Sequence, residues 1–338
     1  VAALARAAGA QWAASQSQDA GARAQAALLR VEVAGDVPLT PVQHWFFEHQ
    51  GANPHHWNQA FLFEVPANTS DVYLANAVEA VIEQHDSLRL RFEYRDGQWV
   101  QYLPARVNRA SDATGADGSC AEEFSRSGDG CTVVDFSGSA GTDREEQLSR
   151  LCARLQASLS ITAGPLLRVA LVRFGPSEPA RVLIVAHHLA VDGVSWRVLR
   201  EDLDRAYEHA ARNTTMAHTT HGTPFSAWSR ATATLTVVDA MAHDLAYWVN
   251  AGAPGTVHVP TDAAAGAGMA ADASTLAVCL TRDETSALFQ RVPAAYNTQI
   301  NDVLLAALAD ALHRWLGDGE FIVNLEGHGR EDIVAVAD

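Results

Sequence analysis

Hydrophobic residues recur along the first part of the chain in strand-like and helix-like windows. Residues 58–65 read as a strand, and residues 88–94 alternate apolar and charged side chains as a half-buried strand does. Residues 71–85 repeat apolar positions with the helical period. Between residues 166 and 186, two apolar runs flank a Gly-Pro-Ser-Glu-Pro turn, which predicts a hairpin, and residues 193–212 form an amphipathic helix. Strands and helices therefore mix throughout, and the predicted fold class is α/β.

The C-terminal part of the chain carries similar signals. Residues 275–281 and 321–325 have the apolar content of strands, and residues 301–315 have the periodicity of a helix. Asn301 is the candidate cap of that helix, and Gly317 is its candidate stop. We therefore expect a second region of strands and helices here.

The length of the chain indicates two domains or lobes. At about 150 residues per domain, 338 residues are enough for two. Residues 1–35 are rich in Ala, Gln, Ser and Gly, and we interpret them as a connector from a preceding domain. We place the first lobe at residues 36–220 and the second at residues 221–338.

The charged residues exclude several classes of protein. The chain has 24 basic and 40 acidic residues, a formal net charge of −16, and every basic residue is arginine. Without lysine there is no Schiff-base chemistry, which excludes a pyridoxal-phosphate racemase, and no lysine for a phosphate-binding loop. The negative charge disfavours broad binding to nucleic acids or anionic membranes.

The cysteines and the apolar runs indicate a soluble protein. The four cysteines lack the close paired spacing of a zinc site, and a disulfide framework is unusual in a chain this long: Cys120, Cys131, Cys152 and Cys279. No segment reads as a signal peptide or as the run of about 20 apolar residues that spans a membrane. We expect a cytoplasmic protein.

The strongest candidate for chemistry is the run His187–Gly193, His-His-Leu-Ala-Val-Asp-Gly, between an apolar strand and an amphipathic helix. Polar side chains there need partners or a task, because burial without hydrogen bonds is costly. We interpret Asp192 as the helix cap, Gly193 as a residue that relaxes the turn, and His187 as a hydrogen-bonded structural residue. His188, beside a structural carboxylate, is suited to proton transfer. Metal binding is disfavoured, since adjacent side chains on an extended strand end point to opposite faces.

A second candidate is Glu326, which follows the predicted strand 321–325 in the sequence Glu-Gly-His-Gly-Arg-Glu. The two glycines permit close backbone approach or unusual torsions. Alone, this segment reads equally well as a solvated turn with an ordinary carboxylate. Together with His188, it indicates a cleft with one acid or base on each wall.

These segments resemble motifs of a known family. The run His187–Gly193 resembles the HHxxxDG signature of the condensation superfamily of nonribosomal peptide synthetases. Three further segments resemble motifs of its epimerization branch, the last being specific to that branch: Pro41–Phe46, Asp302–Ala307 and Glu326–Glu331. Further segments that resemble the same branch are Asn53–Gln59, Val194–Trp196 and Glu201–Leu203. The motifs occur in the family's order from Pro41 to Glu331.

The resemblance implies two chloramphenicol-acetyltransferase-like lobes in a V around a central tunnel. A carrier domain sends its phosphopantetheine arm into such a tunnel, and no intrinsic cofactor or metal is implied. The catalytic residues implied are His188 and Glu326. The residues expected to support the site are His187, Asp192, Gly193, Trp196, Gly327, His328 and Arg330. Domains of this branch continue beyond the last residue here, so we expect an incomplete second lobe.

The predicted function is epimerization of the α-carbon of a carrier-bound aminoacyl or peptidyl thioester. Glu326 would be the general base on one face, and His188 the proton donor or enolate stabiliser on the other. The expected partners are the peptidyl carrier domain and neighbouring synthetase domains. Three alternatives remain: a condensation domain that uses His188 to form a peptide bond, a catalytically silent docking module, and a two-cysteine racemase.

Overall fold

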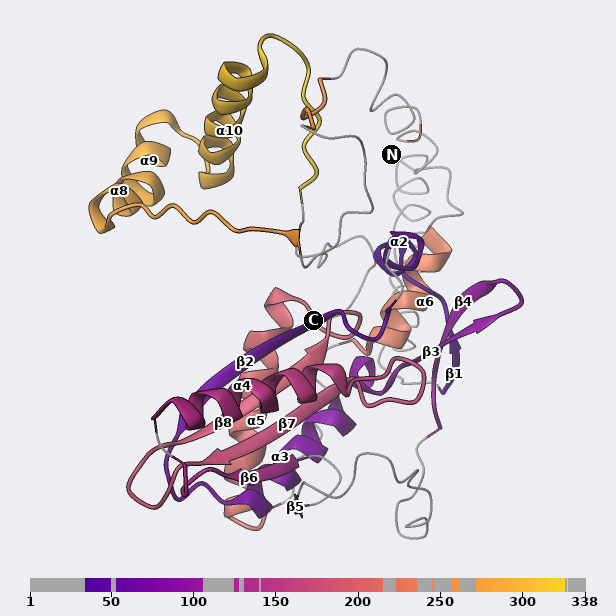
Figure 1. Ribbon diagram of the computed structural model, residues 1–338. Helices are drawn as coiled ribbons and strands as arrows, with labels where there is room; N and C mark the ends of the chain where they lie inside the picture. The colour runs from indigo at the N-terminus through magenta and orange to yellow at the C-terminus, as the bar shows by residue number, and fades with distance from the viewer. Residues whose placement is uncertain are drawn as a thin grey trace, which may run out of the picture. The chain divides into compact units, whose positions relative to one another are not determined.

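A computed structural model describes residues 34–49, 53–105, 125–127, 131–139, 141–214, 223–235, 245, 257–261, 272–325 and 327 (Figure 1). The chain divides into two compact units, one of residues 1–238 with 328–338 and the other of residues 239–327. The predicted connector lies outside the described residues, apart from residues 34 and 35. The lobe boundary between residues 220 and 221 stays a prediction.

The first unit is built on a five-stranded sheet in the order β2-β8-β7-β6-β5. Its strands are β2 (Asn58–Val65), β5 (Ser125–Ser127), β6 (Cys131–Asp135), β7 (Leu167–Arg173) and β8 (Ala180–His187). Strands β6 and β7 are parallel, and the other neighbours are antiparallel. Strands β7 and β8 pair from Leu167 with Ala186 to Val172 with Arg181, which confirms the predicted hairpin.

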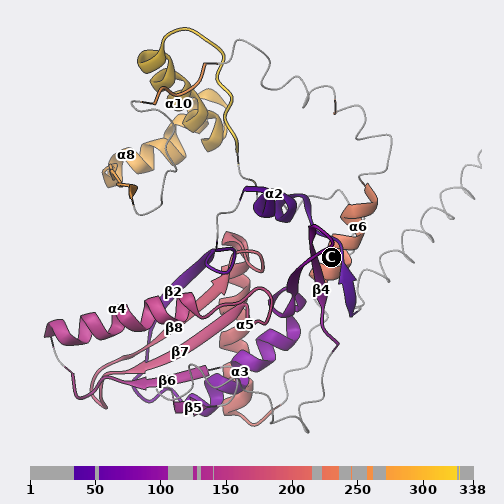
Figure 2. The same cartoon turned by 45° about the vertical axis from the view of Figure 1, so that its right-hand side comes forward.

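Helices cover both faces of this sheet. Helices α3 (Asp71–Gln84) and α5 (Gly193–Ala211) lie on one face and α4 (Gly141–Ala157) on the other, as Figures 1 and 2 show from two directions. Along β7, Val169 packs into the core with α3 and α5, while its neighbour Ala170 packs into the core with α4. Because both faces are buried, β7 and β8 are almost continuously apolar instead of alternating.

The first unit also contains a three-stranded sheet in the order β1-β4-β3. Its strands are β1 (Gly35–Val37), β3 (Arg91–Arg95) and β4 (Gln98–Leu103). The same unit contains the helices α2 (Pro41–His49) and α6 (Phe225–Leu235). The predicted strand 88–94 begins later than expected, because residues 86–89 form a 3₁₀ turn. In that turn the buried carboxylate of Asp86 accepts the backbone N–H groups of Phe225 at 2.8 Å and Ser226 at 2.9 Å. Capping the start of α6 therefore overrides the alternating pattern.

The regular elements described in the second unit are helices, and extended segments precede and follow them. Its helices are α8 (Arg282–Ser286), a π-helical turn (Ala287–Arg291), α9 (Val292–Tyr296) and α10 (Ile300–Leu316). The predicted helix 301–315 and its stop at Gly317, with φ 85°, are confirmed. The predicted cap is wrong: Asn301 lies inside the first turn and Gln299 is the cap. The backbone N–H of Gln299 donates to Asp302 Oδ2 at 2.8 Å, so the cap lies two residues before the predicted one and the helix begins at Ile300.

The two strands predicted in this unit are absent from the described residues. Residues 275–281 and 321–325 join no sheet there. Just before the second segment, the backbone N–H of Val257 donates to the carbonyl oxygen of Glu320 at 2.9 Å. Leu276 and Val278 are 92% and 86% exposed. A strand needs a neighbour to pair its backbone groups, and the part of the chain that is described supplies none.

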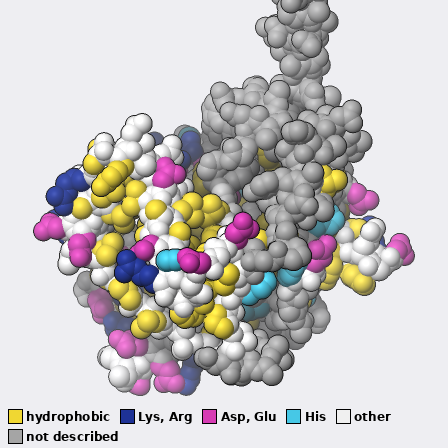
Figure 3. All heavy atoms as spheres, turned by 90° about the horizontal axis from the view of Figure 1, so that it is seen from above, with side chains coloured by type: hydrophobic (Ala, Val, Ile, Leu, Met, Phe, Trp, Pro, Cys, Tyr) yellow, Lys and Arg dark blue, Asp and Glu magenta, His cyan; other side chains and the backbone are white. Residues whose placement is uncertain are grey.

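The described side chains visible in Figure 3 form no extended basic field. Hydrophobic side chains are visible over much of the described surface there, and Arg side chains occur in small separate groups. This distribution agrees with the net charge of −16. Among the described residues, no helix is long and apolar enough to cross a membrane.

Candidate active site

The candidate site lies where β8 ends and α5 begins. Asp192 is the N-cap of α5: its Oδ1 accepts the Ser195 backbone N–H at 2.8 Å and the Ser195 hydroxyl at 2.7 Å. The Ser195 Oγ accepts the backbone N–H of Asp192 at 3.2 Å, which closes a capping box. Gly193 has an ordinary φ, and no described atom lies within 4 Å of a Cβ added to it. The strand-to-helix turn is thus fixed by local hydrogen bonds.

Asp192→Ala is expected to destabilise the fold, because it removes the acceptor for the first turn of α5. The loss of such a cap costs about 0.5–2 kcal/mol, or a few degrees of Tm. Asp192→Asn keeps an acceptor at the same place and should stay close to wild type in thermal unfolding. Equal destabilisation by both substitutions would show that the charge of the carboxylate matters more than the cap.

His187 is fully buried and structural in its contacts. Its Nδ1 accepts the backbone N–H of Leu189 at 3.2 Å, and its Nε2 lies 2.9 Å from the carbonyl oxygen of Pro54. Nε2 therefore carries the hydrogen, and the neutral ring is satisfied at both nitrogens. The ring also meets Phe46 edge to face, with centroids 6.1 Å apart. Burial, reinforced by the neighbouring histidines, lowers the pKa of His187 from 6.5 to about 4.

The lowered pKa of His187 predicts acid sensitivity of the fold. Between about pH 6.5 and pH 4 the unfolded chain binds a proton at this ring that the folded chain does not, so the free energy of unfolding falls as pH falls. The full loss below pH 4 is about 3 kcal/mol. His187→Gln should flatten this part of a plot of stability against pH, whereas His44→Gln, at an exposed histidine, should leave it unchanged. If stability changed with pH equally in the wild type, His187→Gln and His44→Gln, the lowered pKa of His187 would be contradicted as the cause of the acid sensitivity.

His188 is half-buried and held on two sides. Its Nδ1 lies 2.9 Å from the carbonyl oxygen of Val191, and its Nε2 lies 3.0 Å from Nε2 of Gln59 on β2. The backbone N–H of His188 donates to the carbonyl oxygen of Trp57 at 2.8 Å. The ring is thus anchored by its own turn and by the neighbouring strand, with Nε2 directed away from the turn.

Trp196 supports this arrangement from the first turns of α5. Its indole Nε1–H donates to Gln59 Oε1 at 2.5 Å, and its ring packs edge to face on Phe61, with centroids 4.7 Å apart. Only 8% of Trp196 is exposed. The sequence did not predict that Gln59 contacts His188. Gln59 belongs to the motif Asn53–Gln59, but it reaches the histidine because β2 pairs with β8.

This strand–turn–helix unit lies in a region that matches a known family. The Condensation domain model matches residues 33–114 and 129–337. The chain belongs to the condensation-domain family. Its α/β architecture matches solved condensation and epimerization domains, which confirms the predicted fold class and its chloramphenicol-acetyltransferase-like character. Domains of this family need no intrinsic cofactor, and the phosphopantetheine arm belongs to a partner carrier domain.

Several relatives of this condensation-family chain are long synthases. One of the linear gramicidin synthase proteins of Brevibacillus parabrevis is 38% identical over 306 residues, 89% of this chain and 6% of that protein. Gramicidin S synthase 1 of Brevibacillus brevis is 33% identical over 303 residues, 89% of this chain and 26% of that protein. The crystal structure of the epimerization domain from the third module of tyrocidine synthetase B has a TM-score of 0.75 and 31% identity, covering 90% of this chain and 63% of that one. The chain therefore spans only part of each.

The glutamate motif falls largely outside the described residues. Glu326, His328 and Arg330 are among the residues whose structure is not described. Gly327 is exposed, and no described atom lies within 4 Å of a Cβ added to it. The expected opposition of Glu326 and His188 therefore stays a prediction from sequence.

The described cysteines do not suit a two-cysteine racemase. Burial raises the pKa of the Cys131 thiol to about 12, and burial also raises the pKa of Cys152. Both are therefore poor thiolate bases at neutral pH. Cys279 is exposed in the second unit, and Cys120 lies outside the described residues.

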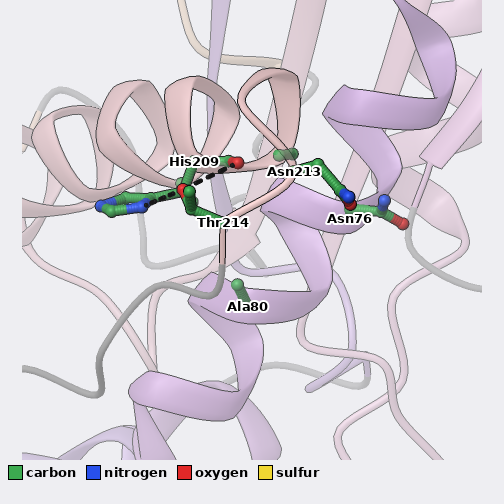
Figure 4. Close-up of a pocket in the computed structure, with 7 residues that line it drawn as sticks. Asn76, Ala80, His209, Asn213 and Thr214 are labelled. Carbon is green, nitrogen blue, oxygen red and sulfur yellow. Dashed lines mark hydrogen bonds between the residues drawn. The ribbon is translucent and has the colours of Figure 1, made fainter.

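Other features of the described residues offer no rival site. No group of three or more His, Cys, Asp or Glu side chains there could hold a metal ion. An open pocket of about 260 Å³ lies between α3 and the end of α5 (Figure 4). In it, Nδ1 of His209 lies 2.9 Å from the hydroxyl of Thr214. The rest of its lining is small or amide side chains, Asn76, Ala80, Ala206, Ala210 and Asn213, and His188 is not part of it.

Proposed function

We propose that this chain is an epimerization domain of a nonribosomal peptide synthetase. Its substrate is an aminoacyl or peptidyl thioester on the phosphopantetheine arm of a peptidyl carrier domain. The product is the mixture of the two configurations at the α-carbon. The observation that carries this proposal is the glutamate motif Glu326–Glu331, which in this sequence accompanies the histidine motif His187–Gly193. The likeness to a solved epimerization domain supports it.

The proposed reaction is a proton transfer at carbon. A base removes the α-proton, the electron pair of the C–H bond moves into the thioester carbonyl to give an enolate, and a proton returns to the opposite face. We assign Glu326 and His188 as the proton-transfer pair, one on each face. In the direction in which Glu326 is the base, His188 returns the proton or stabilises the enolate, and in the reverse direction their roles exchange. The capped turn at Asp192 and the contacts of His188 with Val191 and Gln59 keep the histidine in place.

Peptide-bond formation is the second candidate function. The family as a whole is described as a condensation domain, and the histidine motif is shared by both branches. In that reaction His188 would assist attack of an amine on a donor thioester, and a second carrier would be needed. A silent docking module would bind the carrier and leave its thioester unchanged.

Deuterium uptake at the α-carbon separates these functions. The complete synthetase module that contains this chain is loaded with one aminoacyl or peptidyl thioester in deuterated water, with no acceptor carrier present. Epimerization predicts uptake of deuterium together with a mixed D and L product. Several side chains should be tried, so that a poor substrate is not mistaken for an inactive domain. No uptake with any of them, but peptide-bond formation after an acceptor carrier is added, would identify condensation instead.

A further inference from the structure

We propose that Gln59, fixed by Trp196, is a positioning residue that holds His188 as a neutral ring with its hydrogen on Nδ1 and with Nε2 as the acceptor. Three elements of the first unit meet in this arrangement. Gln59 comes from β2, His188 from the end of β8 and Trp196 from α5. Their contacts form a chain from Trp196 Nε1 through the Gln59 amide to His188 Nε2, with distances of 2.5 and 3.0 Å.

The orientation of the Gln59 amide follows from its partner. An indole N–H can only donate, so the Gln59 atom 2.5 Å from Trp196 Nε1 must be the oxygen. The amide NH₂ group then faces His188 Nε2 at 3.0 Å. A flipped amide would place two donors against each other at Trp196. The amide therefore presents a donor to the histidine.

The form of His188 follows in the same way. The atom opposite Nδ1 is the carbonyl oxygen of Val191 at 2.9 Å, which can only accept, so Nδ1 carries a hydrogen. The atom opposite Nε2 is an amide donor, so Nε2 offers its lone pair. A second hydrogen on Nε2 would oppose the amide hydrogen, and the amide cannot turn without breaking its bond to Trp196.

This state gives His188 a direction of action if epimerization, the function proposed above, is correct. The single N–H of the ring is engaged by Val191, so the resting ring cannot donate a proton to the substrate. In its first step the hydrogen bond from the Gln59 amide to Nε2 breaks, and Nε2 takes up the α-proton of the substrate. A protonated Glu326 returns a proton on the opposite face. The resulting imidazolium and carboxylate are the forms that run the reverse reaction, in which Glu326 is the base. Loss of a proton from the imidazolium to water and uptake of a proton from water by the Glu326 carboxylate reset the pair.

The test is ¹⁵N NMR of the histidine rings in the whole chain, with the His188 signals identified by their loss in His188→Asn. We expect a pyrrole-like Nδ1 and a pyridine-like Nε2 in the wild type. In Gln59→Glu one carboxylate oxygen can still accept from Trp196 while the other faces Nε2, so Nε2 should gain a hydrogen and become pyrrole-like. Gln98→Glu makes the same charge change at an exposed site on β4 and should leave both signals unchanged.

The same variants can be compared for α-proton exchange. Gln59→Leu should lower the rate by about 10- to 100-fold, as when a group that orients a metal-bound histidine is removed, and Gln98→Glu should not lower it. A pyrrole-like Nε2 in the wild type, or an unchanged ring in Gln59→Glu, would overturn the inference. Absence of exchange in the wild type, with the expected NMR signals, would instead overturn the proposed function and leave the positioning role of Gln59 intact.

Discussion

Replacing His188 by alanine is expected to lower α-proton exchange on a loaded carrier by about 10²–10⁴-fold, the range for loss of a positioned acid or base. The fold should tolerate the change, since His188 is only half-buried and the cap at Asp192 is independent of its side chain. Deuterium uptake, normalised to the fraction of folded protein, measures the effect. Binding of the loaded carrier should remain.

His187→Ala is the matched comparison for this prediction. The His187 ring is fully buried, so its removal leaves a cavity and an unpaired carbonyl at Pro54, and Tm should fall. After normalisation to the fraction of folded protein, His187→Ala should lose far less α-proton exchange than His188→Ala. Equal and small effects at both positions would favour a structural role for the whole histidine pair.

Glu326→Gln is expected to abolish most α-proton exchange, by a factor similar to that of His188→Ala. The amide keeps the shape of the side chain but removes the group that accepts or returns a proton. Carrier binding and Tm should remain close to wild type. Deuterium uptake and carrier binding, measured on the same preparation, separate chemistry from recognition.

Glu320→Gln serves as the control for that substitution. It makes the same chemical change six residues earlier, at an exposed side chain in the described part of the second unit. Its exchange rate should equal that of the wild type. Wild-type exchange in Glu326→Gln as well would contradict the role of Glu326 in the proton transfer.

Elements whose signals are local could be predicted from the sequence. The hairpin of β7 and β8 and helix α5 were predicted because a turn, a cap and an apolar period lie within a few residues of one another. Where formation depends on distant partners, prediction failed. Residues 275–281 have strand composition but no neighbouring strand among the described residues, and the turn at residues 86–89 forms because Asp86 caps a helix that begins at Phe225.

The sequence by itself determined the family resemblance, the pair of candidate residues His188 and Glu326, and the cap at Asp192. Each of these rests on residue types at short, fixed spacings. Only the tertiary structure decided which form of His188 the site holds. Gln59 lies 129 positions away in the chain and reaches the ring because β2 pairs with β8, and Trp196 then fixes the direction of its amide. The contact between Gln59 and His188 results from strand pairing. The residues next to either one in the sequence do not predict it, because pairing depends on how the whole sheet packs.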